Sequence, residues 1–493
     1  MGDEVEERAF SSEDRTRHRE KIRRSLDVLA RLLRSERFES ARPMTGMEVE
    51  LHLVDGHGDP ASTSAEVLET LDDEEFQTEL GQFNLEINLP PVPPGEGGLG
   101  TLEAGLLRRL ARTARHARAH DSQPVMIGIL PTLREEHLQQ RYLSDDPRYR
   151  LLEKQILRDR GEHLRIRISG RERVDLTSDT IMPEAACTSA QFHVQVRPEE
   201  FGQYWNAAQA IAGFQLAVGA NSPYLLGQEL WRETRIPLFE QATDTRREEL
   251  KAQGVRPRVW FGERWITSVF DLFEENVRFF PALLPVLEDE DPVAVLDDGG
   301  VPTLPELRLH NGTVYRWNRP VYDVVDDGDG PVPHLRVENR VLAAGPTVLD
   351  TMANHAFFLG LVRALAEAPR SVWTRMPFEI AEQNFHLAAR LGVDAQLAWP
   401  EHGQAPATEI VLRELLPLAH SGLSSWGVDQ ATAGRLLGVI EGRCERRTNG
   451  AAWFVGRVRE RLDAGEDRHT AQRAALLEYC RRADTGDPVH TWV

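Results

Sequence analysis

Several features are scarce in this chain of 493 residues. Its three cysteines, Cys187, Cys444 and Cys480, are spaced too widely for a disulfide framework or a zinc site, which favours a reducing compartment. No run approaches 18 uninterrupted apolar residues, and the acidic start of the chain lacks the apolar core of a signal peptide. We therefore expect a soluble, cytoplasmic protein without a membrane span.

Positive charge is outnumbered, because 58 lysines and arginines stand against 78 aspartates and glutamates. The formal net charge of −20 argues against broad binding to nucleic acid or to anionic lipid, and solubility is its simplest explanation. The motifs G-x-x-x-x-G-K-[ST], H-E-x-x-H and G-x-S-x-G are absent. Residues 95–100 fit G-x-G-x-x-G but follow a proline-rich stretch instead of a buried strand, and residues 326–330 lack the distal glutamate of a calcium loop. A nucleotide site here would have to bind phosphates through metal ions and arginines.

Two segments of the chain alternate polar and apolar residues with period 2. In residues 46–53, Glu48 and Glu50 share one side of a strand, and in residues 82–89, Glu86 lies on the polar side between two asparagines. Like charges side by side on a sheet repel each other, so stacked carboxylates need a counter-charge. Carboxylate and amide oxygens are the ligands that a hard cation such as Mg²⁺ selects.

The remaining pattern indicates strands mixed with helices, followed by helices alone. We expect strands at 125–130, 188–196, 312–325 and 334–342, loops at 292–305 and 326–333, and helices at 12–40, 101–120, 198–221, 347–367, 377–391, 408–420, 428–447 and 468–483. This order predicts an α+β fold. The alternation within strands predicts an antiparallel sheet with one face on the core and the other lining a wet cleft.

Glu50 and Glu86 are the strongest candidate metal ligands, with Glu48 on the same face. The alternative is a solvated polar strand face. Glu79 lies seven residues before Glu86, so it joins the site only if the chain bends near Gly81; otherwise it is a solvated loop acid. Gln191 and His193 share a face of the next predicted strand, where they either bind metal or form structural hydrogen bonds.

Arginines accompany these acids. Glu338 and Arg340 share one face of a predicted strand, either as a weak salt bridge or with the carboxylate on a cation and the guanidinium on a phosphate. Arg246, in a polar segment, is a candidate for substrate or nucleotide contact, and it interests us more than its neighbours Arg235 and Arg247. Asn318 and Arg319 follow Trp317 in a composition typical of a binding loop.

These residues together resemble the motifs of the glutamate–cysteine ligase superfamily, and most closely those of its bacterial carboxylate–amine ligase branch, the second glutamate–cysteine ligase family. Residues 46–50 resemble the G-x-E-x-E strand, 79–88 the second acidic strand, 188–196 the histidine strand and 337–340 the E-x-R strand. The resemblance covers roughly residues 43–400. Where this branch usually has H-x-H, the chain has Gln191 and His193.

The resemblance implies a glutamine-synthetase-like fold, in which a curved antiparallel sheet with flanking helices holds two or three Mg²⁺ ions, or Mn²⁺, between ATP and an amino-acid carboxylate. The γ-phosphate passes to the carboxylate, an amine attacks the acyl phosphate, and ADP and phosphate leave. It implies a ligase with small-molecule amino-acid and amine substrates, in chemistry like that of glutathione biosynthesis. Glu48, Glu50, Glu79, Glu86, Gln191, His193 and Glu338 would serve the cations, and Arg340 the transferred phosphoryl group.

Two other functions stay open at this point. One is a phosphotransferase that acts on a carboxylate or guanidino substrate without an acceptor amine, and the other is a non-catalytic sensor of a nucleotide or metabolite on the same fold. We expect an N-terminal helix in residues 1–42, a catalytic domain in 43–400 and a helical C-terminal region in 401–493. The sequence does not give the oligomeric state.

Overall fold

The computed structural model describes residues 10–35, 37–38, 43–326, 328 and 330–492. A seven-stranded sheet lies at its centre, with the strand order β12-β13-β7-β1-β3-β2 and with β4 paired to β1; every pair is antiparallel. These strands are β1 (Thr45–Asp55), β2 (Phe76–Thr78), β3 (Asn84–Val92), β4 (Ser122–Val125), β7 (Ala190–Val196), β12 (Asn318–Asp326) and β13 (Pro331–Leu342). The predicted α+β class, with a curved antiparallel sheet, flanking helices and a helical C-terminal region, is confirmed.

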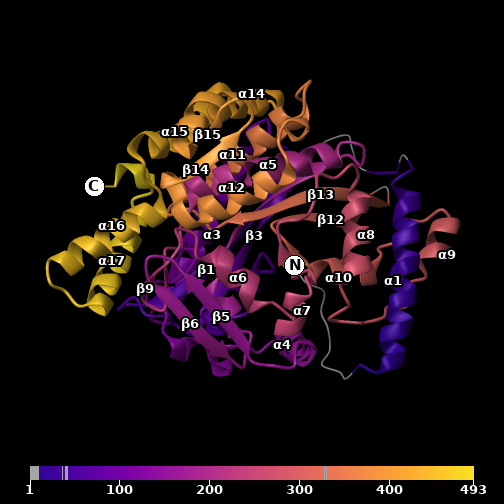
Figure 1. Ribbon diagram of the computed structural model, residues 1–493, viewed down its shortest axis with the longest axis horizontal. Coiled ribbons are helices and arrows are strands. Elements are labelled where there is room, and N and C mark those ends of the chain that lie inside the picture. Colours follow the sequence, from indigo (N-terminus) through magenta and orange to yellow (C-terminus); the bar gives the residue numbers. More distant parts are fainter. Residues whose placement is uncertain (1–9, 36, 39–42, 327, 329, 493) are drawn as a thin grey trace.

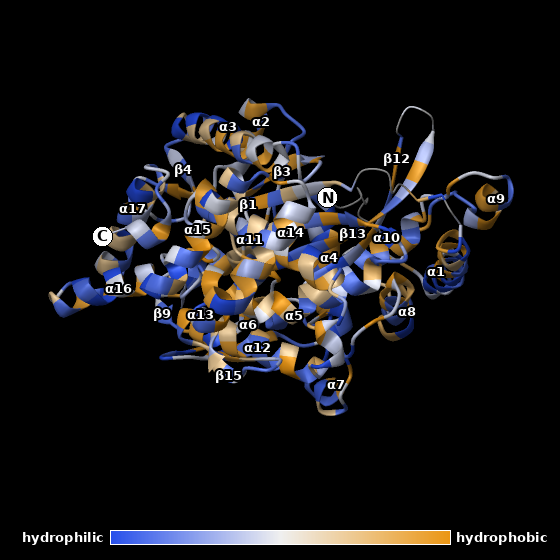
Figure 2. Cartoon of the chain, turned by 90° about the horizontal axis from the view of Figure 1, so that it is seen from above, coloured by the Kyte–Doolittle hydropathy of each residue, from blue (hydrophilic) through white to orange (hydrophobic). Residues whose placement is uncertain are grey.

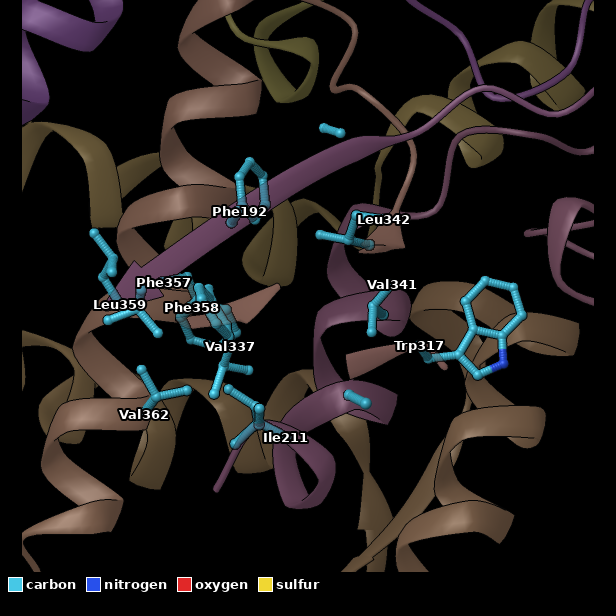
Figure 3. Close-up of a cluster of buried hydrophobic side chains, with 14 of the residues drawn as sticks. Phe192, Ile211, Trp317, Val337, Val341, Leu342, Phe357, Phe358, Leu359 and Val362 are labelled. Carbon is cyan, nitrogen blue, oxygen red and sulfur yellow. The ribbon is translucent and has the colours of Figure 1, made fainter. Parts of the chain in front are cut away.

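The apolar side of the sheet packs on helices. Helices α5 (Phe201–Gly219) and α11 (Val348–Ala366) contact the sheet and each other, because both are apolar around most of their circumference. Figure 3 shows Phe192 of β7 and Val337 of β13 among Ile211 of α5 and Phe358 of α11. The alternating residues of the strands therefore fill a dry core on this side and leave their polar partners on the other.

The polar side of the sheet faces shorter elements. Helices α4 (Pro147–Arg160) and α6 (Arg235–Ala242), the short helix η3 (Met182–Ala186) and the hairpin of β5 (Leu164–Ser169) and β6 (Arg173–Ser178) lie on this side. In Figure 1 they occupy the region below the sheet, opposite the layer of α5, α11 and α12 (Phe378–Leu391). A cavity remains between these elements and the sheet.

Other helices surround this centre. They are α1 (Ser12–Leu32), α2 (Ser64–Leu71), α3 (Gly98–Arg118), α7 (Glu248–Ala252), α8 (Val269–Phe279), α9 (Pro292–Asp297), α10 (Pro305–Gly312), α13 (Ala407–Ile410), α14 (Leu416–Ser425), α15 (Gln430–Arg446), α16 (Gly450–Asp463) and α17 (Arg468–Ala483). Figure 2 shows long orange stretches in the central helices such as α5 and α6, and more blue in outlying ones such as α3 and α16. Among the described residues, no helix is both long and apolar enough to cross a membrane.

Several predicted boundaries were wrong. Helix α1 ends at Leu32, well before Pro43, while residues 36 and 39–42 lie outside the described part. The strand predicted at 125–130 ends at Val125, and the following residues are buried without strand pairing, because burial on all sides gives the same apolar run as a strand. The predicted loop at 292–305 contains α9.

The helical end of the chain also differs from the prediction. It contains helix α16, which we did not expect, and a hairpin of β14 (Gln396–Trp399) and β15 (Gly403–Pro406). The expected hairpin tip connects β12 to β13, although residues 327 and 329 lie outside the described part. The predicted domain boundaries at residues 42 and 400 stay predictions.

Candidate active site

A cavity of about 920 Å³ lies against the polar side of the sheet. Its walls come from β1, β3, β7 and β13 on one side and from α4, η3 and α6 on the other. Of the residues singled out in the sequence, the cavity is lined by Glu48, Glu50, Glu79, Glu86, Gln191, Arg319 and Arg340. Strand alternation therefore brings together residues that are up to about 290 positions apart in the chain.

Three of these acids form a tight cluster, which we call the carboxylate trio. Glu50 and Glu86 are directly opposed on β1 and β3, and each offers an oxygen within 4.8 Å of the others and of one from Glu79. Within the described part of the chain, no lysine, arginine or histidine forms an ion pair with any of the three. Opposed like charges destabilise a sheet, so the trio has a strong electrostatic need for a cation.

The chain bends to bring Glu79 into the trio. Strand β2 ends at Thr78, and a turn closed by the Asn84 N–H donating to the Gly81 carbonyl at 2.8 Å leads into β3. A side chain at Gly81 would collide with Asn84, so the residue type permits the tight approach. The bend on which the inclusion of Glu79 depended is thus present at the expected glycine.

The pKa values of the trio are raised. Burial, followed by the charges of Glu48 and Glu50, raises the pKa of Glu86 to about 7. Burial, then Glu50 and Glu86, raises the pKa of Glu79 well above its usual range, and burial raises that of Glu50. A divalent cation stabilises the ionised forms of carboxylates crowded in this way and displaces their protons, so this donor set fits Mg²⁺ or Mn²⁺.

A second set of acids on the same sheet, Glu48 of β1 and Glu338 of β13, already faces positively charged or histidine side chains. We call Glu48, His193, Glu338, Arg319 and Arg336 the ion-paired group. The Arg319 Nε and Nη2 donate to the two oxygens of Glu338 at 3.0 and 2.7 Å. Burial opposes ionisation of Glu338, but Arg319 and then Arg340 lower its pKa to about 2.

The histidine of this group is held between an arginine and an acid. The Arg336 Nε donates to the His193 Nδ1 at 3.2 Å, so the Nε2 carries the ring proton, and it lies 3.2 Å from the Glu48 Oε1. Burial would raise the pKa of Glu48, but His193 holds it well below its usual range. A cation at Glu48 would therefore compete with His193 for the carboxylate.

Gln191 connects the trio to Arg340. Its amide nitrogen donates to the Glu50 Oε1 at 3.0 Å, and its amide oxygen accepts from the Arg340 Nη2 at 3.2 Å. Glu50 also accepts from the backbone N–H of Ser189 at 2.6 Å and from its hydroxyl at 2.9 Å. Arg340 is thereby fixed beside the trio with its guanidinium at the cavity.

The sequence motifs can now be compared with known families. Residues 44–259 match the model of glutamate–cysteine ligase family 2. The resemblance inferred from the short motifs is confirmed. The matched segment contains the trio, Glu48 and His193, whereas Glu338 and Arg340 lie beyond it. No curated protein sequence matches the chain.

Solved structures of similar fold include ligases. The glutamate–cysteine ligase of Francisella tularensis in complex with AMP has a TM-score of 0.53 at 12% identity, over 91% of this chain and 94% of that one. A bifunctional glutathione synthetase from Pasteurella multocida has a TM-score of 0.46 at 13% identity, over 93% of this chain and 54% of that one. The first of these likenesses shows a shared fold.

Two predicted substrate or nucleotide contacts of this chain are not at the cavity. Asn318 lies on the core side of β12, where its amide donates to Gln209 and accepts from Asn339, both at 2.7 Å. Arg246 pairs with Asp244 at 2.9 Å and is absent from the cavity lining. The alternation of β12 explains the first case, because neighbouring Asn318 and Arg319 must face opposite sides of the sheet.

Arg235, which we had ranked below Arg246, does line the cavity. It is 3% exposed, its Nε donates to the Glu233 Oε1 at 3.1 Å, and it donates to the carbonyl of Val341. Glu233 in turn accepts from the Asn221 N–H at 2.7 Å, and the Asn221 amide donates to the Tyr479 hydroxyl of α17 at 2.9 Å. A helix of the C-terminal region thus supports a cavity arginine through buried hydrogen bonds.

Trp317 of the predicted binding loop also lines the cavity, whereas other lining residues gave no signal in the sequence. An aromatic wall consists of Phe239, Tyr315 and Trp317, with the Phe239 ring 5.4 Å and 5.7 Å from the other two ring centres. Glu184 of η3 also lines the cavity. These residues lie on elements too short for a hydrophobic period, so only their position in space reveals them.

Proposed function

We propose that this chain is an ATP-dependent carboxylate–amine ligase of the glutamate–cysteine ligase type, which forms an amide through an acyl phosphate. The match to glutamate–cysteine ligase family 2 supports a carboxylate–amine ligase. The observation that carries the proposal is the carboxylate trio, which forms no ion pair within the described part of the chain and lies at a cavity that also presents Arg235, Arg319 and Arg340.

Phosphoryl transfer between two anions needs charge neutralisation and alignment. Glu50, Glu79 and Glu86 would hold Mg²⁺ or Mn²⁺, and Glu48, with His193 and Glu338 behind it, is the candidate for a second cation. When bound, such ions neutralise phosphate and carboxylate oxygens and orient the γ-phosphate. The number of ions, two or three, belongs to the proposal.

The residues of the chain supply the remaining steps. Arg340, fixed by Gln191, presents its guanidinium to the transferred phosphoryl group, where a planar fork binds two oxygens at once. Arg235, held by Glu233, offers a second fixed cation for a substrate carboxylate or phosphate. Residues of α4, η3 and α6 line the cavity opposite the sheet, where they would shield part of an acyl phosphate from water.

The test is coupling between ATP use and amide formation. Purified protein is incubated with MgATP and L-glutamate, with and without L-cysteine and a panel of other amines, while ADP and amide product are measured. We expect ADP release that depends on an amine and equals the amide formed. Glutamate-dependent ADP release without an amine requirement would favour the phosphotransferase instead. ATP binding without turnover on any combination would favour a sensor.

A further inference from the structure

Glu184 is an acid at the cavity that its surroundings leave unsatisfied. It lies in η3, and its side chain lines the cavity opposite the sheet. Within the described part of the chain its carboxylate forms no hydrogen bond and no ion pair, and its Oε2 is shut off from solvent. A buried carboxylate oxygen without a hydrogen-bond partner is costly, so its place at the cavity points to a ligand.

The other cavity acids already have partners or a common task. Glu48 faces His193, and Glu50, Glu79 and Glu86 form the trio. Asp146 caps helix α4, accepting from the Arg148 N–H at 2.7 Å. Glu184 therefore differs from every other described acid of the cavity lining, because it has neither a protein partner nor a neighbouring acid within a metal-binding cluster.

Glu184 lines the same cavity as Arg340 and Glu50. Burial raises its pKa to about 8, Arg340 opposes this rise, and Glu50 of the trio adds to it. Arg340 is the proposed phosphoryl contact and Glu50 belongs to the proposed cation site. Glu184 thus shares its cavity with both parts of the proposed acyl-phosphate centre.

We infer that Glu184 binds the ammonium group of the acceptor amine and takes one proton from it. This inference rests on the proposed ligase function. An incoming ammonium ion supplies the missing counter-charge, and it must lose a proton before it can attack. The other acids at the cavity are directed to cations or to helix capping, so Glu184 is the group left for this task.

The proton and electron balance of the step is complete. One proton moves from the ammonium nitrogen to the Glu184 carboxylate, which becomes a carboxylic acid. The nitrogen lone pair then forms the C–N bond to the acyl carbon, and the bond from that carbon to the phosphate oxygen breaks. Phosphate leaves with the bonding electron pair and takes up the second proton that the nitrogen gives up when the amide forms.

Hydroxylamine separates this role from acyl-phosphate formation, because it is an uncharged nucleophile at neutral pH and needs no prior deprotonation. The experiment compares wild type, Glu184→Gln and Asp146→Asn with MgATP and L-glutamate, using either hydroxylamine or the best ammonium acceptor of the wild type. Asp146→Asn is the matched control, since it removes another cavity acid while asparagine still caps a helix. Hydroxamate formation also reports that each variant is folded.

We expect Glu184→Gln to keep hydroxamate formation within about threefold of wild type and to lose amide formation with the ammonium acceptor by roughly 10²- to 10⁴-fold. Asp146→Asn should keep both. An equal loss of both reactions in Glu184→Gln, or full amide formation by it, would overturn the inference. If the wild type itself makes no hydroxamate with glutamate or with any carboxylate tested, the proposed function fails instead.

Discussion

Glu48 and Glu50 are two positions apart on the same strand and face the same cavity, yet their charges are balanced in opposite ways. Glu48 lies against His193, which holds its pKa well below the usual range. Glu50 lies opposite Glu86, and burial raises its pKa. The trio is short of positive charge, whereas the ion-paired group carries its own. Strand β1 thus carries one acid that is available to a cation, Glu50, and another that is already paired within the protein, Glu48.

The largest expected effect comes from removing a charge of the trio. Glu86→Gln should lower turnover by roughly 10²- to 10³-fold, because a ligand of the cation is lost. It should also leave the metal-free protein as stable as wild type, or more stable by up to about 1 kcal/mol, because opposed like charges disappear. Steady-state kinetics and urea unfolding in EDTA measure the two quantities.

The matched control is Glu74→Gln, an exposed acid on the loop before β2 that lies outside the cavity lining. It should change neither quantity. A Glu86→Gln protein that turns over at the wild-type rate, or whose free energy of unfolding is several kcal/mol lower, would contradict this account. The trio would then have a structural role, as the ion-paired group does.

The ion-paired group should respond in the opposite sense. Arg319→Met leaves the Glu338 carboxylate, 1% exposed, with only the longer contact to Arg340 at 3.4 Å, which should lower the free energy of unfolding by up to about 3–5 kcal/mol. The double variant Arg319→Met/Glu338→Met should regain much of this loss, because no buried charge is left unpaired. Urea unfolding of the three proteins measures the coupling, and a single variant as stable as wild type would contradict the assignment.

A smaller effect is the pH dependence of stability without metal. The folded pKa of Glu86, about 7, exceeds its ordinary value of 4.5, so its stabilising contribution is full below pH 4.5 and is lost as the pH rises through 7. Glu338, with a folded pKa of about 2, contributes fully above pH 4.5, and this contribution is lost as the pH falls towards 2.

Melting temperatures in EDTA from pH 4 to 8 should therefore fall more steeply for wild type than for Glu86→Gln. Saturating Mg²⁺ should flatten the wild-type curve, because the bound cation favours the ionised carboxylates. If melting temperature depends on pH in the same way for both proteins, with and without Mg²⁺, then Glu86 does not ionise between pH 4 and 8 as the account requires.

The sequence predicted the parts of this site that lie on long alternating strands. Glu48, Glu50 and Glu86 face the cavity because period 2 fixes the side of a strand, and Glu79 joins them through the bend that its spacing required. Asn318 was predicted at the binding site because it is polar, but its side chain lies on the core side of β12, where it donates a hydrogen bond to Gln209.

The remaining parts depend on contacts between distant segments. Glu184 lies on a helix too short to show a hydrophobic period. Arg235 is held at the cavity by Glu233, whereas Arg246 pairs with Asp244, and no local sequence pattern reveals this difference. Likewise the internal neutralisation of Glu338 depends on the register that opposes it to Arg319 across β12 and β13. Pairing register and tertiary contact, not residue type, decide these roles.

The most direct test of the central claim is a Mn²⁺ titration without nucleotide, followed by electron paramagnetic resonance of the free ion. The account predicts that wild type binds a tight ion, that Glu86→Gln loses it, and that Glu48→Gln, which leaves the trio complete, retains it. Equal Mn²⁺ binding by wild type and Glu86→Gln would contradict the assignment of the trio as the cation site of a ligase.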